Sequence, residues 1–201
     1  TLDVYDSSGL HPAMEVIRSV EQYVDLSRVR AVGCLFNEVR SVLDTFVHGL
    51  SGRELKIEQG EYAYTDSETI YLPRVVSLLE SKEDNFNLYK AMVTMLWAQT
   101  RYGTFRNSPL QQLNRYDDPA SAVRLYHVLE TIRLEACIER ELPGLHRRML
   151  VMKARVDMHY PRSLSEAISQ LADKAATAGD SVLWVERLYG EEINLVDCYQ
   201  G

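Results

Sequence analysis

The stretch FNLYKAMVTMLWAQTRYGT, residues 86–104, decides the fold of this chain, because its apolar residues fall on every face of a helix. A helix of this kind is buried at the centre of a domain. A second long helix is expected over residues 120–141, after Asp118 as the cap and Pro119 at the first helical position. Pro143-Gly144 ends that helix. The two helices predict a mainly α fold built around a helical core.

The region before this core is expected to hold a pair of helices in residues 1–50 and a small sheet in residues 51–73. His11-Pro12 opens the first helix, and Ser51-Gly52 ends the second. Alternating polar and apolar residues on both sides of Asp66-Ser67 then predict two or three short antiparallel strands.

Residues 74–201 are expected to be helical, so that residues 1–201 form one domain. We expect a short helix at 74–79, a polar loop at 107–117 and a helix at 145–159. Ser163-Leu164-Ser165-Glu166 has the spacing of a capping box, and a last helix at 180–189 is closed by Gly190.

Composition narrows the class of protein. The chain has 201 residues, of which 46% are hydrophobic, enough for a sizeable core without metal or disulfide support. Three cysteines without a C-x-x-C motif favour reduced thiols and a cytoplasmic location. We expect no membrane-spanning or export segment, because the sequence has no apolar stretch of about 18 residues. The net charge of −7 gives no overall attraction to nucleic acid.

The helix at 86–104 and the short strand before it are similar to the core of a degenerate zincin, a metallopeptidase fold. A zincin carries two histidines four residues apart on this helix. Here Met95 and Gln99 stand where they would fall, so we expect neither a zinc ion nor an activated water. This favours a binding or scaffolding role without a cofactor.

One alternative is a metal site in the second long helix. His127 and Glu130 lie three residues apart on one face, with Glu135 further along. A helical di-metal site needs a second such motif and two further glutamates, and the sequence shows neither. We therefore favour a polar network in which Glu130 pairs with Arg133. The sequence also lacks a nucleophile-elbow motif and a Walker phosphate loop.

A basic cluster follows the second long helix. It contains Arg147, Arg148 and Arg155, together with His146, Lys153 and Arg162. Arg148, Met152 and Arg155 share a helical face by their spacing, which makes a positive stripe. This stripe is either an ordinary solvated face or a dock for an acidic patch on a protein partner, whose binding would then depend on salt.

Four segments in a fixed order carry a family resemblance: TDSETIYLP at 65–73, NLYK at 87–90, YGTF at 102–105 and LETIRLE at 129–135. Over roughly residues 50–145 the chain resembles the N-terminal region of CbbO/NorD-type von Willebrand factor A adaptor proteins. The matching positions Asp66, Gly103, Thr104, Glu130, Arg133 and Glu135 are expected to be architectural.

The resemblance implies a function. In that family the N-terminal region is followed far downstream by a von Willebrand factor A domain with a metal-dependent adhesion site. That module is not expected in this chain, because Asp6-Ser7-Ser8-Gly9-Leu10 departs from D-x-S-x-S at the last position.

The family's adaptors serve a hexameric AAA+ ATPase of the MoxR class, here a CbbQ-like one. The client is Rubisco, which is freed of inhibitory sugar phosphates, or nitric oxide reductase during maturation. We expect a non-catalytic adaptor, with Rubisco favoured as client. A metallopeptidase-like hydrolase using His127, Glu130 or Glu135 and a purely structural helical domain remain as alternatives.

Overall fold

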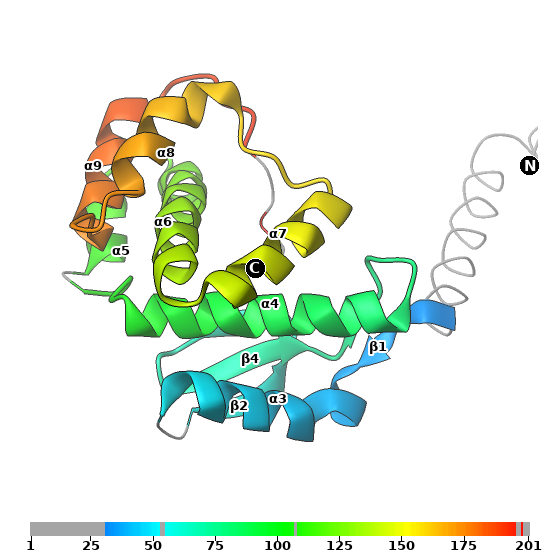
Figure 1. Ribbon diagram of the computed structural model, residues 1–201. Helices are drawn as coiled ribbons and strands as arrows, with labels where there is room; N and C mark the ends of the chain where they lie inside the picture. Colours follow the sequence, from blue (N-terminus) through cyan, green and yellow to red (C-terminus); the bar gives the residue numbers. More distant parts are fainter. Residues whose placement is uncertain (1–30, 53–54, 107, 196–197, 199–201) are drawn as a thin grey trace, which may run out of the picture.

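The computed structural model describes residues 31–52, 55–106, 108–195 and 198, and it is built around α4, Lys82–Arg101 (Figure 1). This helix is buried on most of its surface, as its all-round apolar sequence predicts. Ser81 caps it, since the Ser81 side chain accepts a hydrogen bond of 3.0 Å from the Asp84 amide. A mainly α fold with small β-sheets is thereby confirmed.

One side of α4 is covered by α3, Phe36–Ser51, and by the strands (Figure 1). α3 buries Phe36, Leu43 and Val47 and ends at Gly52, whose φ of 62° is the left-handed conformation expected of a terminating glycine. A short antiparallel pair joins β1, Cys34–Leu35, to β5, Val75–Val76.

The larger sheet has three strands in the order β2–β4–β3. They are β2, Lys56–Gly60; β3, Tyr64–Thr65; and β4, Thr69–Pro73. β3 and β4 form the antiparallel hairpin predicted around Asp66-Ser67, but β2 pairs with β4 in parallel, with Ile57 opposite Ile70. The sheet is therefore mixed, because the chain passes from β2 to the far edge before β4 fills the centre.

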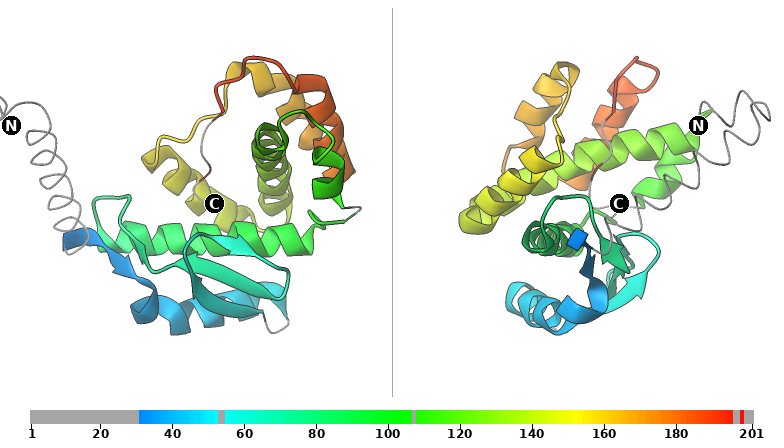
Figure 2. Two further views of the ribbon diagram at one scale, coloured as in Figure 1. Left: turned by 180° about the vertical axis from the view of Figure 1, so that it is seen from behind. Right: turned by 90° about the vertical axis from the view of Figure 1, so that its right-hand side faces the viewer.

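The other side of α4 carries the remaining helices. They are α5, Pro109–Leu113; α6, Pro119–Glu141; α7, Pro143–Arg155; α8, Ser165–Leu171, after a 3-10 turn at Arg162–Leu164; and α9, Ala178–Leu188. α6 runs across α4 rather than along it, as the two views in Figure 2 show. α7 packs on both α4 and α6, whereas α8 and α9 pack on α6.

Buried apolar residues form two clusters that share α6. The first joins α3, the strands, α4 and α7, and it includes Leu134 and Ile138 from the second half of α6. The second joins α5, α8 and α9 to the first half of α6, including Leu125 and Leu129. α6 is therefore the element that links the two clusters.

Four local predictions need correction or lie outside the described residues. The helix expected at 74–79 is wrong, because Val75 and Val76 form β5. The loop expected at 107–117 contains the short helix α5. The capping box at Ser163–Glu166 is wrong, since α8 starts after Leu164 with no side-chain cap. The first helix, opened by His11-Pro12, lies outside the described residues, and the zincin-like character of the core stays a prediction.

The end of α9 agrees with the sequence, since Gly190 follows it with a φ of 92°. Within the described ranges, no helix has both the length and the apolar character needed to cross a bilayer.

Candidate docking groove

Thr104, Glu130 and Arg133, which fall within the sequence motifs, meet in a buried polar network between the end of α4, α6 and α9. Arg133 donates two hydrogen bonds to Glu130, from Nη2 at 2.5 Å and from Nε at 2.9 Å. The carboxylate also accepts from Thr104 Oγ1 at 2.6 Å and from Ser181 Oγ at 2.8 Å. The predicted pairing of Glu130 with Arg133 is confirmed. Ser181, in α9, was not foreseen.

Gly103 shapes the turn that brings Thr104 into this network. Its φ is 73°, a conformation that residues with a Cβ seldom adopt. The Thr104 carbonyl then accepts a 2.9 Å hydrogen bond from the Tyr126 hydroxyl, and Arg133 Nη2 reaches the Tyr102 carbonyl at 3.2 Å. These bonds fix the end of α4 against α6, which is an architectural role.

Asp66 and Glu135 lie outside the network. Asp66 caps the turn between β3 and β4, where its carboxylate accepts from the amides of Thr69 at 2.7 Å and Glu68 at 2.9 Å. These two bonds hold the pKa of Asp66 below its usual range. Glu135 bonds Lys153 at 2.7 and 2.9 Å and so ties α6 to α7.

The metal alternative places His127 and Glu130 on one face of α6. Burial lowers the pKa of His127 and so favours the neutral imidazole that a metal would need. Both oxygens of Glu130, however, are already held by Arg133, Thr104 and Ser181. Among the residues that the structure describes, no three His, Cys, Asp or Glu side chains are grouped to hold an ion. The contacts of Glu130 therefore favour the network over a metal site.

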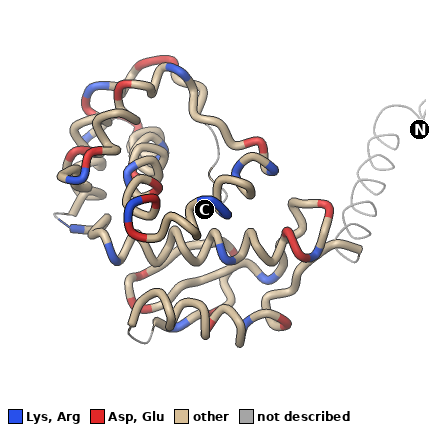
Figure 3. The backbone as a smooth tube through the Cα atoms, in the orientation of Figure 1, with Lys and Arg blue, Asp and Glu red and all other residues tan. Residues whose placement is uncertain are grey.

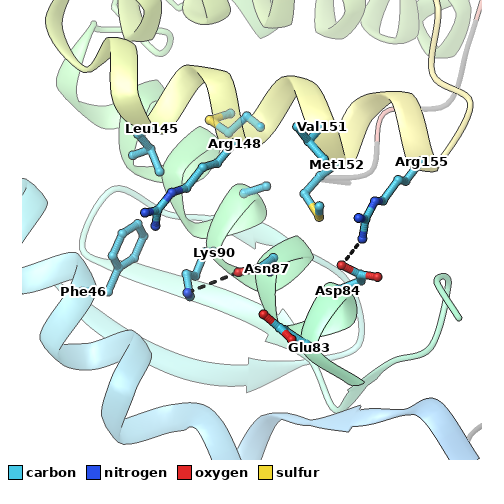
Figure 4. Close-up of a pocket in the computed structure, with 12 residues that line it drawn as sticks. Phe46, Glu83, Asp84, Asn87, Lys90, Leu145, Arg148, Val151, Met152 and Arg155 are labelled. Carbon is cyan, nitrogen blue, oxygen red and sulfur yellow. Dashed lines mark hydrogen bonds and ion pairs between the residues drawn. The ribbon is translucent and has the colours of Figure 1, made fainter. Parts of the chain in front are cut away.

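An open groove of about 500 Å³ lies between α4 and α7, with Phe46 of α3 at one end (Figure 4). Its apolar surface comes from Phe46, Ala91, Leu145, Met149, Val151 and Met152. Val151 is 49% exposed, so part of this apolar surface meets solvent. The groove thus combines apolar and charged lining side chains with free access to solvent, as a docking site for an amphipathic protein segment requires.

Two cations face the groove without a carboxylate partner. Arg148 extends from α7 toward Phe46 and Lys90 (Figure 4). Lys90 donates to Asn87 Oδ1 at 3.3 Å and lies 4.2 Å from the centre of the Phe86 ring. Burial and the nearby Arg148 charge lower the pKa of Lys90. In the described part of the chain, neither Lys90 nor Arg148 forms an ion pair.

The opposite end of the groove is acidic. Glu83 and Asp84 lie in the first turn of α4, where carboxylates are favoured by the helix dipole. Arg155 of α7 forms an ion pair with Asp84, marked by a dashed line in Figure 4. The groove is therefore positive around Lys90 and Arg148, and it is negative at Glu83, where Arg155 balances only Asp84. Figure 3 shows an acidic segment in the first turn of α4 and a basic segment further along the helix.

A second depression, of about 630 Å³, continues the groove past the start of α7. It shares four lining residues with the first, namely Phe46, Leu145, Arg148 and Val151, and it adds Leu50, Leu142, Gly144 and Arg147. The two depressions share lining residues and so form one continuous surface, which we call the α4–α7 groove.

Three members of the predicted basic cluster line this groove: Arg147, Arg148 and Arg155. Others do not, because His146 is buried and Lys153 is bound to Glu135. Met152, predicted on the same face as Arg148, is buried at the base. The sequence analysis did not predict Lys90 or Phe46 as groove residues. The position of Lys90 within an apolar stretch of helix was the one feature of the sequence that could have indicated it.

No protein-family model, no curated protein and no solved structure matches this chain. The contacts and charges of the α4–α7 groove, together with the sequence motifs, are therefore the basis for a function.

Proposed function

We propose that this chain is a non-catalytic adaptor domain that binds a protein partner in the α4–α7 groove. The observation that carries the proposal is that, among the described residues, Lys90 and Arg148 have no carboxylate partner although they lie beside an accessible apolar surface. Cations that have no carboxylate partner and lie beside an apolar surface attract a protein segment of opposite charge, which favours its binding there.

The partner we propose is a hexameric AAA+ ATPase of the MoxR class, similar to CbbQ. The ordered motifs between residues 65 and 135 support it, because they resemble those of CbbO/NorD-type adaptors. In this proposal the domain anchors the adaptor on the hexamer in the cytoplasm. ATP-driven movement then passes through the adaptor to a client held by another module, with Rubisco favoured over nitric oxide reductase.

The motif residues support the anchoring role in a second way. Thr104, Glu130 and Arg133 lock α4 to α6, and Glu135 locks α6 to α7 through Lys153. The α4 and α7 walls of the groove are therefore tied to the same helix, α6. A domain that transmits force between two proteins needs such fixed walls, because a loose wall would absorb the movement.

Size-exclusion chromatography of the purified chain with the MoxR-type ATPase of the same organism tests the proposal. We expect co-elution with the hexamer in the presence of ATP. Separate elution with ATP, with ADP and without nucleotide would contradict it. Metal analysis of the same fractions tests the hydrolase alternative, which stoichiometric zinc or iron would support.

A further inference from the structure

We propose that the α4–α7 groove binds an acidic amphipathic helix of the partner, with carboxylates at Lys90 and Arg148 and apolar residues against Phe46, Leu145 and Val151. The identity of the partner is taken from the proposed function. The new element is the chemistry of the partner segment that docks in the groove.

A helix suits the groove better than an extended strand. The walls are three helices, α3, α4 and α7, whose backbone amides and carbonyls bond within each helix. They offer no free strand edge to which an extended peptide could add. A helix satisfies its own backbone and presents side chains alone, which is what a groove between helices accepts.

The charges select an acidic occupant. Lys90 and Arg148 approach the groove from opposite walls, so a carboxylate between them contacts both. Arg147 extends the positive region into the continuing depression. A basic segment would meet repulsion from three cations along this stretch, and a neutral one would place no carboxylate beside Lys90 and Arg148.

The acidic end sets the direction of the occupant. Asp84 is already paired with Arg155, and Glu83 beside it adds negative charge. A carboxylate placed there would be repelled. The acidic residues of the partner helix therefore lie toward Arg148 and Arg147, and its neutral or basic end lies over Glu83 and Asp84.

A labelled peptide provides a direct probe of the groove. The probe is an amphipathic helix of about 14 residues with leucines at i, i+3, i+4 and i+7 and glutamates beside them. Its twin carries lysines in place of the glutamates. Fluorescence anisotropy with the full chain is expected to show binding of the acidic peptide, weakened by salt, and at least about tenfold weaker binding of the twin.

Charge reversal then locates the site. Arg148→Glu is expected to weaken binding of the acidic peptide by about tenfold or more and to improve binding of the basic twin. Arg115→Glu is the matched control, because it makes the same change in net charge on an exposed residue after α5, outside the residues that line the groove. Circular dichroism checks that both variants fold.

The same variants separate this inference from the adaptor function. Loss of ATPase co-elution in Arg148→Glu, but not in Arg115→Glu, supports both. An ATPase complex that Arg148→Glu leaves intact overturns the helix-docking inference while the adaptor function stands. If neither the unaltered chain nor either variant binds the ATPase, the adaptor function fails. The peptide measurements then test the helix-docking inference by themselves. Equal binding of the acidic peptide and its basic twin would overturn it.

Discussion

Glu130 is a buried carboxylate whose four hydrogen bonds come from three different helices or their ends. Its side chain and that of Arg133 are only 2% and 3% exposed. A buried ion pair adds little by itself, but removing one partner leaves a charge without compensation. The pair therefore makes the structure sensitive to single substitutions and tolerant of a matched double one.

Arg133→Met is expected to lower the free energy of unfolding by about 3–5 kcal/mol, because it leaves the Glu130 charge buried and unpaired. Urea denaturation measures the change. The double variant Glu130→Gln with Arg133→Met is the control, since Gln keeps an acceptor for Thr104 and Ser181 without a charge. We expect the double variant to be more stable than Arg133→Met alone, and the reverse order would refute this account of the network.

Gly103 is a second position at which a single substitution is expected to destabilise the chain. Alanine there must keep a φ of 73°, and its Cβ would lie 2.7 Å from Cδ of Arg106. The Arg106 side chain can move away, but the backbone conformation remains unfavourable by about 1–2 kcal/mol. Gly103→Ala is therefore expected to destabilise the chain by about that amount in thermal or urea unfolding.

Gly144 provides the matched control for Gly103. It lies in the first turn of α7, and a Cβ there would meet no atom within 4 Å. Gly144→Ala should be neutral or stabilising, by up to about 1 kcal/mol, because it restricts the unfolded chain. Equal destabilisation by both substitutions would show that strain at Gly103 is not the cause.

Helix caps stabilise individual helices. Thr177 caps α9 in a reciprocal box, in which Asp180 accepts from the Thr177 amide at 2.7 Å. Thr177→Ala is expected to cost about 1 kcal/mol of stability in urea unfolding. Ser163→Ala, in the sequence pattern that resembled a capping box, should cost little, because Ser163 caps no helix. A larger loss at Ser163 would contradict this assignment of caps.

Capping aspartates also predict how stability depends on pH. Asp118 caps α6 by accepting from the amides of Ala120 and Ser121, and these bonds lower its pKa. Backbone hydrogen bonds lower the pKa values of Asp66 and Asp180 in the same way. Because a lowered pKa means that the unfolded chain binds protons more readily, the contribution is present above about pH 4 and lost below it.

Unfolding midpoints measured at several pH values check this dependence. They should fall as the pH drops through the range in which the aspartates protonate. Asp118→Asn keeps a good cap and removes the titrating group, so its midpoint should fall less steeply. A slope equal to that of the unaltered chain would show that Asp118 does not contribute.

The elements that the sequence predicted well are those whose own residues determine them. α4 followed from its apolar faces, α6 from Asp118 and Pro119, and the end of α3 from Gly52. α5 was missed because its five residues are held by the burial of Pro109 and Leu113 rather than by a periodic pattern. The parallel pairing of β2 with β4 was missed because alternation of side chains does not encode strand direction.

The groove likewise contains residues that the sequence predicted and residues that only tertiary packing brings together. The spacing of Arg148 and Arg155 along one helix predicted that they share a face, and both line the groove. The opposing Lys90 and the aromatic end at Phe46 come from α4 and α3, which only tertiary packing brings to α7. Pairing of Arg155 with Asp84 likewise joins residues far apart in sequence, and it leaves Arg148 as the cation available to a partner.

Helix α6 and the Glu130 network link the two apolar clusters of the molecule. Trp97 lies in the cluster of α3, α4 and α7, and Trp184 lies in the cluster of α8 and α9. These are the two tryptophans of the chain. Each therefore reports on one cluster, and the prediction that residues 1–201 form one domain can be tested by comparing them.

We expect the two clusters to unfold together, because separating them would break the Thr104 and Ser181 bonds to Glu130 and expose the centre of α6. In Trp184→Phe, the fluorescence of Trp97 should change at the same urea concentration as far-ultraviolet circular dichroism. In Trp97→Phe, Trp184 should behave likewise. Adding Arg133→Met to each variant should pull the two signals apart, with Trp184 changing first. Signals already separate with the network intact would mean that the clusters are independent units and that the groove walls are held by the first cluster alone.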